Sequence, residues 1–200
     1  MRLRRKLSML AIAALFLAGC KFQFGVGYNQ GHSPVQPIPY DHELHVTKNG
    51  IQCQFCHSQV ESSRHSNIPS LQTCMKCHLT VRADSPFIQK IREAYDKGES
   101  IEWKRVHLLP DFVNFNHAAH VTKGVNCETC HGPVQTMKQV SQFSDLSMGW
   151  CINCHRETEV KMDGNGYYDE LHKKLAAKYG ADAKLTVDKI GGLECARCHY

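Results

Sequence analysis

HAAHVTKGVNCETCH, residues 117–131, combines a Cys-x-x-Cys-His motif with two further histidines placed just upstream, His117 and His120. In C-x-x-C-H the two thiols can form thioethers with the vinyl groups of a haem, and the adjacent imidazole binds the haem iron. Chance would supply roughly 0.04 such motifs in a chain of this composition. The sequence contains five: Cys53/Cys56/His57, Cys74/Cys77/His78, Cys127/Cys130/His131, Cys151/Cys154/His155 and Cys195/Cys198/His199. We therefore expect five covalent haems c, each with the motif histidine as its proximal ligand.

Zinc sites and disulfides are the other common uses of paired cysteines. A zinc ribbon would pair C-x-x-C units with one another and needs no histidine after every second cysteine. A disulfide framework would show scattered spacings. Ten of the eleven cysteines belong to the five motifs, and Cys20 alone remains. The pattern favours haem, with zinc as the alternative.

The N-terminal segment predicts export. Four basic residues within positions 2–6 precede a short apolar run over residues 7–18. Residues 17–20, LAGC, resemble the lipobox of bacterial lipoproteins, in which the cysteine is acylated and the preceding peptide removed. We expect a lipoprotein-type signal peptide over residues 1–19 and lipidation at Cys20. The alternative is an ordinary signal peptide or an uncut anchor, and all three export the chain to a compartment that suits c-type haem.

The net charge gives no support for a nucleic-acid partner. The formal charge of +5 includes four positive residues of the signal peptide, which leaves the mature apoprotein near +1. Five ferric haems at about −1 each would bring the holoprotein to roughly −4. No run of lysines or arginines follows Lys6, so we expect no nucleic-acid binding.

The chain length limits the core. About 181 mature residues would serve five haems, some 36 residues for each, too few for a conventional apolar core around every cofactor. The porphyrins must then supply much of the apolar interior. The expected fold is a multihaem cytochrome c over residues 41–200, with mainly short α-helices and irregular loops wrapped round five stacked haems and little β-structure.

Three segments between the motifs have a recognisable character. Residues 20–40 contain glycines and prolines without periodicity and predict a flexible tether. Residues 85–86, Ser-Pro, predict the start of a helix that ends before Gly98. A second helix is expected over residues 167–179, before Gly180. Its apolar stripe consists of Tyr168, Leu171, His172, Leu175 and Tyr179.

The two upstream histidines belong to an internal repeat. An H-x-x-H unit precedes two of the attachment motifs, and an aromatic residue stands two positions before each unit. The corresponding residues are Tyr40, His42, His45 and Cys53 in the first copy, and Phe115, His117, His120 and Cys127 in the second. This arrangement resembles the small multihaem cytochromes of the class III type. The resemblance implies that the first histidine of a unit ligates the haem attached just downstream and the second ligates a different haem. The implied distal ligands are His42 for the haem at His57, His117 for the haem at His131, and His45 and His120 for neighbouring haems.

A fifth distal ligand is needed if every iron has two axial ligands. His107 lies in an apolar segment, with burial against backbone as its other interpretation. His172 lies on the apolar stripe of the second expected helix. Met148 stands three residues before a motif cysteine, where a thioether would raise the haem potential, although such a methionine usually packs in a core. His32 and His65 lie in polar surroundings and are expected at the surface.

The unaltered motifs favour electron transfer over chemistry at the iron. A multihaem reductase of nitrite, hydroxylamine or a sulfur oxyanion needs an iron with an open face, often marked by lysine in place of the motif histidine. None of the five motifs is altered in this way. We expect an electron-transfer protein rather than an enzyme. A small multihaem reductase is the alternative, and a sensing or structural use of haem is the third possibility.

A narrower resemblance covers about four fifths of the chain. It is carried by PIPYDHELH at 37–45, NIPSLQTCMKCH at 67–78, the segment 101–134 and LSMGWCINCHR at 146–156. These stretches are similar to the pentahaem cytochrome c subunit of alternative complex III, a quinol:electron-acceptor oxidoreductase. The resemblance implies integral-membrane quinol-binding subunits, a large periplasmic iron–sulfur subunit and a monohaem cytochrome as partners. It further implies electron transfer towards a soluble cytochrome or terminal oxidase.

The expected location is the periplasmic side of the bacterial inner membrane, with a lipid anchor. The family subunit can instead carry an N-terminal transmembrane helix, and LAGC departs from that pattern. Lys21 is compatible with sorting to the outer membrane. The alternative is therefore a lipidated cytochrome that conducts electrons towards the cell exterior.

Overall fold

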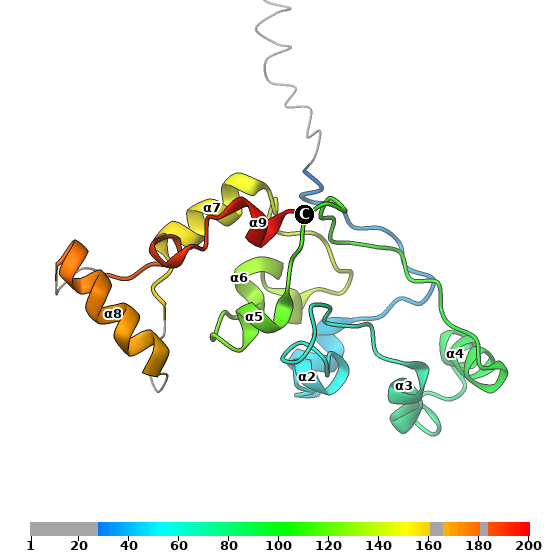
Figure 1. Ribbon diagram of the computed structural model, residues 1–200. Helices are drawn as coiled ribbons and strands as arrows, with labels where there is room; N and C mark the ends of the chain where they lie inside the picture. Colours follow the sequence, from blue (N-terminus) through cyan, green and yellow to red (C-terminus); the bar gives the residue numbers. More distant parts are fainter. Residues whose placement is uncertain (1–27, 161–165, 181–183) are drawn as a thin grey trace, which may run out of the picture.

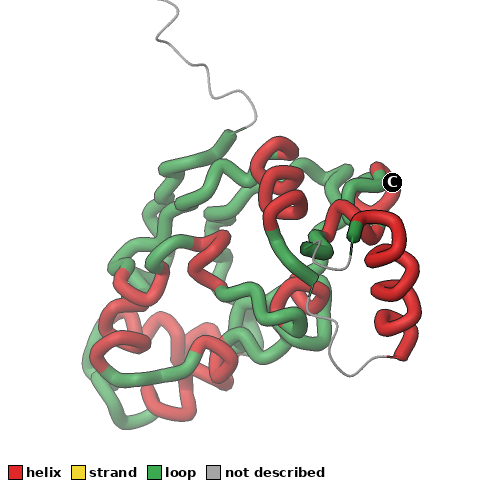
Figure 2. Tube along the Cα trace, turned by 90° about the vertical axis from the view of Figure 1, so that its left-hand side faces the viewer, coloured by secondary structure: helices red, strands yellow, loops and turns green. Residues whose placement is uncertain are grey.

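The computed structural model describes residues 28–160, 166–180 and 184–200 (Figure 1). This part of the chain consists of short helices joined by long irregular loops. Its β-structure is limited to two isolated bridges, Val113 with His199 and Glu159 with Thr186, and Figure 2 shows helix and loop alone. The predicted fold class, short helices and loops with little β-structure, is confirmed.

The attachment motifs, numbered 1 to 5 in chain order, each form a helical turn. Cysteines three positions apart lie on the same side of such a turn, so both thiols of a motif face one neighbour. The helices that carry motifs 1 to 5 are α2 (Cys53–Cys56), α3 (Leu71–His78), α6 (Cys127–His131), α7 (Met148–Glu157) and α9 (Cys195–Cys198). The remaining elements are the π-helical turn η1 (Glu43–Lys48), α4 (Pro86–Lys97), α5 (His117–Val121), η2 (Val134–Thr136), α8 (Gly166–Tyr179) and η3 (Val187–Ile190). None of the helices within the described ranges is long and apolar enough to cross a membrane.

Both helices expected between the motifs are present. α4 starts with proline in its first turn and ends at Gly98, whose φ of 69° is left-handed, a conformation that glycine adopts without strain. α8 begins one residue earlier than expected and lies at the edge of the molecule in both views. Leu171 and Leu175 of α8 are half-buried, but His172 is exposed. The apolar stripe is therefore narrower than predicted, and the side chain of Tyr168 lies outside the described residues.

A small apolar cluster lies at the α3–α4 end of the molecule. Ile38, Met75, Ile88 and Ile91 are buried together, with residues such as Trp103 packed against them. The i, i+3 spacing of the α4 isoleucines places both on the face that meets α3. The cluster involves only one of the five motif helices, in keeping with a chain whose interior is not built from polypeptide alone.

The N-terminal segment differs from the predicted flexible tether. Residues 28–40 are packed against the rest of the chain, whereas 20–27 lie outside the described residues. Ile38 joins the apolar cluster, and the Gln36 side chain exchanges two hydrogen bonds of 2.8 Å with the backbone of Lys104. Amide side chains can satisfy backbone groups of a neighbouring loop, which composition alone does not reveal.

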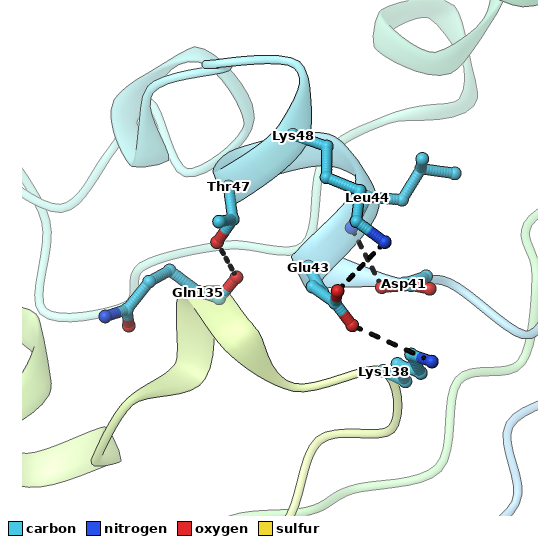
Figure 3. A network of polar contacts seen from close by, with 7 residues as sticks. All are labelled: Asp41, Glu43, Leu44, Thr47, Lys48, Gln135 and Lys138. Carbon is cyan, nitrogen blue, oxygen red and sulfur yellow. Dashed lines mark hydrogen bonds and ion pairs between the residues drawn. The ribbon is translucent and has the colours of Figure 1, made fainter.

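η1, which contains part of the first H-x-x-H unit, is fastened to the segment that follows motif 3 (Figure 3). The Thr47 hydroxyl donates to the Gln135 carbonyl at 2.6 Å. Glu43 lies 2.9 Å from Lys48 Nζ and 3.9 Å from Lys138 Nζ. Because such surface ion pairs are weakened by solvent and salt, the hydrogen bond and packing matter more. The contact places the region of motif 1 beside that of motif 3.

Candidate functional site

The motif cysteines are not arranged as a zinc ribbon or a disulfide framework. All ten are free thiols. Within the described part of the chain, no group of three or more His, Cys, Asp or Glu side chains is placed to hold a metal ion. The described residues therefore do not form the converging set of ligands that the zinc alternative requires.

The ten predicted attachment cysteines differ in their exposure. Six are half-buried, whereas Cys53, Cys77, Cys127 and Cys195 are exposed. Cys77 and the other three thiols are therefore not enclosed by protein atoms. The physical reason is that the polypeptide alone does not enclose these turns, because in such a short chain the porphyrins must supply much of the apolar interior. A thiol that faces a porphyrin is then left open by the protein atoms.

Thiols of motifs 1, 2 and 3 approach one another. Burial raises the pKa of Cys74, and the nearby Cys56 raises it further, which joins motif 2 to motif 1. Burial also raises the pKa of Cys56, and Cys77 of motif 2 contributes to the rise, so both thiols of motif 2 lie near this one cysteine. Burial likewise raises the pKa of Cys127, and the nearby Cys53 adds to the effect. Motif 1 thus lies between motifs 2 and 3.

The same kind of contact continues to the C-terminus. Burial, followed by Cys154 and Cys151, raises the pKa of the Cys130 thiol to about 11, which joins motif 3 to motif 4. Burial and then Cys198 raise the pKa of Cys151, which joins motif 4 to motif 5. We call this spatial order of motifs, 2–1–3–4–5, the attachment row. Figure 1 shows α3, α2, α6 and α7 following one another across the view, with α9 beside α7.

Histidines meet in pairs along the attachment row. An iron between two imidazoles needs ring centroids about 6 Å apart, because each metal–nitrogen bond is about 2 Å and each centroid lies about 1 Å behind its nitrogen. Three pairs have this separation between centroids: His45 and His78 at 6.2 Å, His117 and His131 at 6.4 Å, and His120 and His155 at 6.2 Å. In two of the pairs, the upstream histidine precedes one motif in sequence but faces the histidine of another. His45 precedes motif 1 and faces motif 2, and His120 precedes motif 3 and faces motif 4.

His42 lies beside the histidine of motif 1. Burial, followed by the neighbouring His57 and His45, lowers the pKa of His42 to about 4. A neutral imidazole is the form that binds metals. The buried Nδ1 of His42 has no hydrogen-bond partner among the described residues. This placement supports a pairing of His42 with His57.

Six of these histidines direct Nδ1 towards a backbone carbonyl. Metal-ligating histidines use such a bond to fix the ring and its tautomer while Nε2 stays available. The Nδ1–carbonyl pairs are His45 with Asp41, His57 with Asn67, His78 with Val81, His117 with Arg64, His120 with Asn116 and His155 with Gly192, at 2.8–2.9 Å.

The aromatic residue of each repeat separates its two histidines. Tyr40 meets His42 edge to face at a centroid distance of 4.8 Å and stacks on His45 at 4.4 Å. Phe115 repeats the arrangement, with His117 at 4.8 Å and His120 at 4.7 Å. Aromatic pairs at these distances are attractive. The sequence repeat is therefore a structural repeat, in which one aromatic ring holds two imidazoles facing different ways.

His107 does not occupy the predicted distal position. Its Nε2 lies 3.1 Å from Nδ1 of His131, on the side of that ring away from Nε2, the nitrogen expected to bind iron. The two ring centroids are 4.4 Å apart and the planes are perpendicular, too close for a metal between them. An apolar segment indicates that its histidine is buried, but it does not show which side of another imidazole that histidine meets.

The other candidate ligands have no partner ring in the described structure. His172 is exposed on α8, and Met148 is 66% exposed at the start of α7. The aromatic ring beside His199 belongs to Phe112, with centroids 5.6 Å apart. His32 and His65 are exposed, as expected, and Cys20 lies outside the described residues.

The surroundings of the motifs suit a large apolar group. Phe55 within motif 1 is 49% exposed, and Leu79 and Val81 after motif 2 are 60% and 54% exposed. Apolar side chains left open beside paired imidazoles and free thiols are what a thioether-linked porphyrin would cover. Helical C-x-x-C-H turns in a row, with histidines paired across it, define a multihaem cytochrome c.

Comparison with known proteins agrees with this class. Residues 104–200 match the class III cytochrome c family. Over 165 residues the chain is 30% identical to the multihaem cytochrome c subunit of menaquinone reductase from Nitratidesulfovibrio vulgaris. It is 26% identical to cytochrome c-552 of Porphyromonas gingivalis and 24% identical to that of Bacteroides fragilis. The chain belongs to a family of multihaem cytochromes c, its C-terminal half resembles the class III type, and covalent haem c is its cofactor.

The relatives are longer than the matching region. The match to the menaquinone reductase subunit covers 82% of this chain and 67% of the relative. Each cytochrome c-552 match covers 76% of this chain but 38% of the relative. The similarity therefore extends over most of this chain and only part of the cytochromes c-552.

Proposed function

We propose that this chain carries five haems c and relays electrons as a subunit of a quinol-oxidising membrane complex, towards a soluble cytochrome or a terminal oxidase. The observation that carries the proposal is the continuous attachment row, in which every motif lies next to another. When bound, each haem supplies an iron that accepts and releases one electron. The role of the polypeptide is to hold the haems in fixed positions along the attachment row.

The paired histidines favour transfer over substrate chemistry. His45 connects the region of motif 1 to His78 of motif 2, and His120 connects the region of motif 3 to His155 of motif 4. Each such link fixes neighbouring sites relative to each other. An iron with an imidazole on both faces also has no position for nitrite or a similar substrate, which counts against the reductase alternative at these motifs.

The partners are inferred from similarity. The Nitratidesulfovibrio relative is named as a subunit of a menaquinone reductase, which supports a quinone-linked membrane complex. With the resemblance to alternative complex III, it suggests integral-membrane quinol-binding subunits, a large periplasmic iron–sulfur subunit and a monohaem cytochrome. The relative's name also favours a second candidate, in which electrons run in the opposite direction, from a periplasmic donor to a membrane quinone.

The proposed location is the periplasmic face of the inner membrane, with Cys20 lipidated after removal of residues 1–19. Intact-mass measurement of the mature protein gives both the N-terminal modification and the number of attached haems. A diacylated or triacylated Cys20 and five haems are expected. An unmodified N-terminus, or fewer than five haems, contradicts the corresponding part of the proposal.

Purification of the full chain from detergent-solubilised membranes tests the complex. We expect polytopic subunits and an iron–sulfur subunit to co-purify, and added quinol to reduce the haems of the complex but not those of the separated chain. Reduction of added quinone by the dithionite-reduced complex, without the reverse reaction, would favour the second candidate. Recovery of the cytochrome alone from outer-membrane fractions would exclude the complex. A large high-spin band that responds to nitrite or cyanide would favour a reductase.

A further inference from the structure

The histidine of motif 3 has a hydrogen-bond partner unlike those of motifs 1, 2 and 4. His57, His78 and His155 each place Nδ1 against a backbone carbonyl. His131 places Nδ1 3.1 Å from Nε2 of His107, a side-chain nitrogen. The hydrogen bond at Nδ1 of His131 therefore depends on a side chain, which a substitution can remove. The backbone carbonyls that serve the other three histidines remain whatever residue stands there.

The chain on both sides of His107 is held in place. Arg105 Nε donates to the His107 carbonyl at 3.2 Å, and the Leu108 amide donates to Gln142 Oε1 at 2.9 Å. Gln142 is only 1% exposed, so this anchor is rigid. The perpendicular rings of His107 and His131 direct the Nε2 of one at the Nδ1 of the other. The contact is built into the fold and does not arise from a mobile surface side chain.

The direction of the hydrogen bond follows from the proximal role of His131. A neutral imidazole that binds iron through Nε2 carries its proton on Nδ1, so His131 is the donor. His107 must then accept through an unprotonated Nε2 and carry its own proton on Nδ1.

We propose that His107 is a positioning residue for the proximal ligand of the haem at motif 3, and that it sets the reduction potential of this haem separately from the others. The inference rests on the proposed haem at motif 3. A strong acceptor on Nδ1 increases electron donation from the imidazole to the metal and thereby stabilises the ferric state. An imidazole nitrogen is a more basic acceptor than a peptide carbonyl, so His107 lowers the potential at motif 3.

The lowered reduction potential is important because of where motif 3 lies. It stands in the middle of the attachment row, between motif 1 and motif 4, so all transfer from one end of the row to the other passes it. A lower reduction potential at motif 3 changes the free energy of electron transfer between the two halves of the attachment row. His107 would thus control the central step without touching the haem iron.

The test uses the haem-loaded full chain with His107→Leu, which removes the acceptor, and His107→Gln, which can accept through Oε1. His32→Leu is the matched control, because the His32 carbonyl also bonds to Gln142 but its ring is exposed. Redox titration followed by electron paramagnetic resonance gives the potential of each low-spin haem. The haem of interest is recognisable because the His117 and His131 planes differ by 6°, against 60° and 30° in the two other measured pairs.

We expect His107→Leu to raise the potential of that one haem, His107→Gln to return it towards the wild-type value, and His32→Leu to leave it unchanged. The proposal is overturned if no potential moves, if all move together, or if His107→Gln behaves like His107→Leu. It is also overturned if His107→Leu converts one haem to high spin, since His107 would then be a distal ligand. Haem count and co-purification are measured separately, so failure of the relay function is distinguishable from failure of this inference.

Discussion

The imidazole rings of His120 and His155 lie 6.2 Å apart, although His120 directly precedes motif 3 and His155 belongs to motif 4. The separation suits one metal ion between the two rings. His117, three residues before His120, faces His131 of motif 3 at 6.4 Å. A single short helix, α5, therefore presents one imidazole to each of two neighbouring sites, and the polypeptide holds those two sites together.

The His120→Ala variant should affect the haem at motif 4 and leave the haem at motif 3 intact. Loss of one axial imidazole converts a low-spin haem to high spin, which the ferric visible spectrum and resonance Raman scattering detect. We expect one high-spin haem, reversed by added imidazole. His117→Ala is the matched control and should give the same change at motif 3.

The site of the change can be assigned with a second substitution. Adding Cys151→Ala and Cys154→Ala to His120→Ala removes the attachment at motif 4, and the high-spin signal should disappear with it. Persistence of that signal would mean that His120 serves motif 3, contrary to the geometry.

Tyr40→Ala should loosen two histidines at once. The Tyr40 ring lies between His42 and His45, at centroid distances of 4.8 Å and 4.4 Å. Without it, both imidazoles lose an aromatic neighbour worth about 0.5–1.5 kcal/mol. We expect a partial high-spin signal from motifs 1 and 2 and a lower unfolding temperature of the holoprotein.

Tyr40→Phe is the control for the ring. It keeps the contact with both imidazoles and removes only the hydroxyl, which lies near Cys56. Its spectrum should match the wild type. Equal effects of the two substitutions would show that the hydroxyl, rather than the ring, positions the histidines.

Asn67→Val should disturb the proximal histidine of motif 1. Asn67 adopts a left-handed φ of 59°, and its carbonyl accepts from His57 Nδ1 at 2.8 Å. Asparagine tolerates this conformation, whereas a β-branched residue is strained there by about 1–2 kcal/mol. Relief of that strain would move the carbonyl away from His57. We expect reduced stability and a raised potential of one haem.

The Asn67→Gly variant distinguishes the effect of the backbone conformation at residue 67 from the effect of its side chain. Glycine adopts the left-handed conformation freely and keeps the carbonyl in place, so the potential should stay near that of the wild type. If Asn67→Gly shifts the potential as much as Asn67→Val, the side-chain amide, whose Oδ1 accepts from the Gln59 amide at 3.4 Å, is responsible instead.

Local features of this protein could be predicted from its sequence, but their arrangement in space could not. The C-x-x-C-H motifs and the capping signals of α4 are local patterns, and local chemistry determines them. The adjacency of Cys53 and Cys127 is different, because it depends on how η1 docks on the segment after motif 3. A periodic sequence pattern does not predict a contact between two such distant segments. The spatial order 2–1–3–4–5 therefore could not be read from the chain order.

The misplacement of His107 has a related cause. An apolar segment indicates that the histidine is buried, and burial beside a motif suggests ligation. Which nitrogen of which ring it meets depends on the anchor between Leu108 and Gln142, two residues in separate loops. The flexible tether expected up to residue 40 fails for the same reason, since its amide side chains bond to loop backbone around Lys104.

Gly132→Ala should destabilise the protein more than an equivalent glycine substitution elsewhere. Gly132 directly follows His131, has a φ of +64°, and would place a Cβ 2.3 Å from the Phe143 ring. Its ψ of −161° places Gly132 in a backbone region that is essentially confined to glycine, so an alanine there is strained by about 1–3 kcal/mol. Overpacking typically adds about 1–3 kcal/mol. Gly50→Ala introduces an alanine at a positive φ without a clash, because Gly50 has a φ of +68° and open space around it. Thermal unfolding of the holoproteins should show the larger loss for Gly132→Ala, together with a perturbed signal from the haem at motif 3. Equal losses for the two variants would mean that Phe143 moves aside freely and does not hold the end of that motif in place.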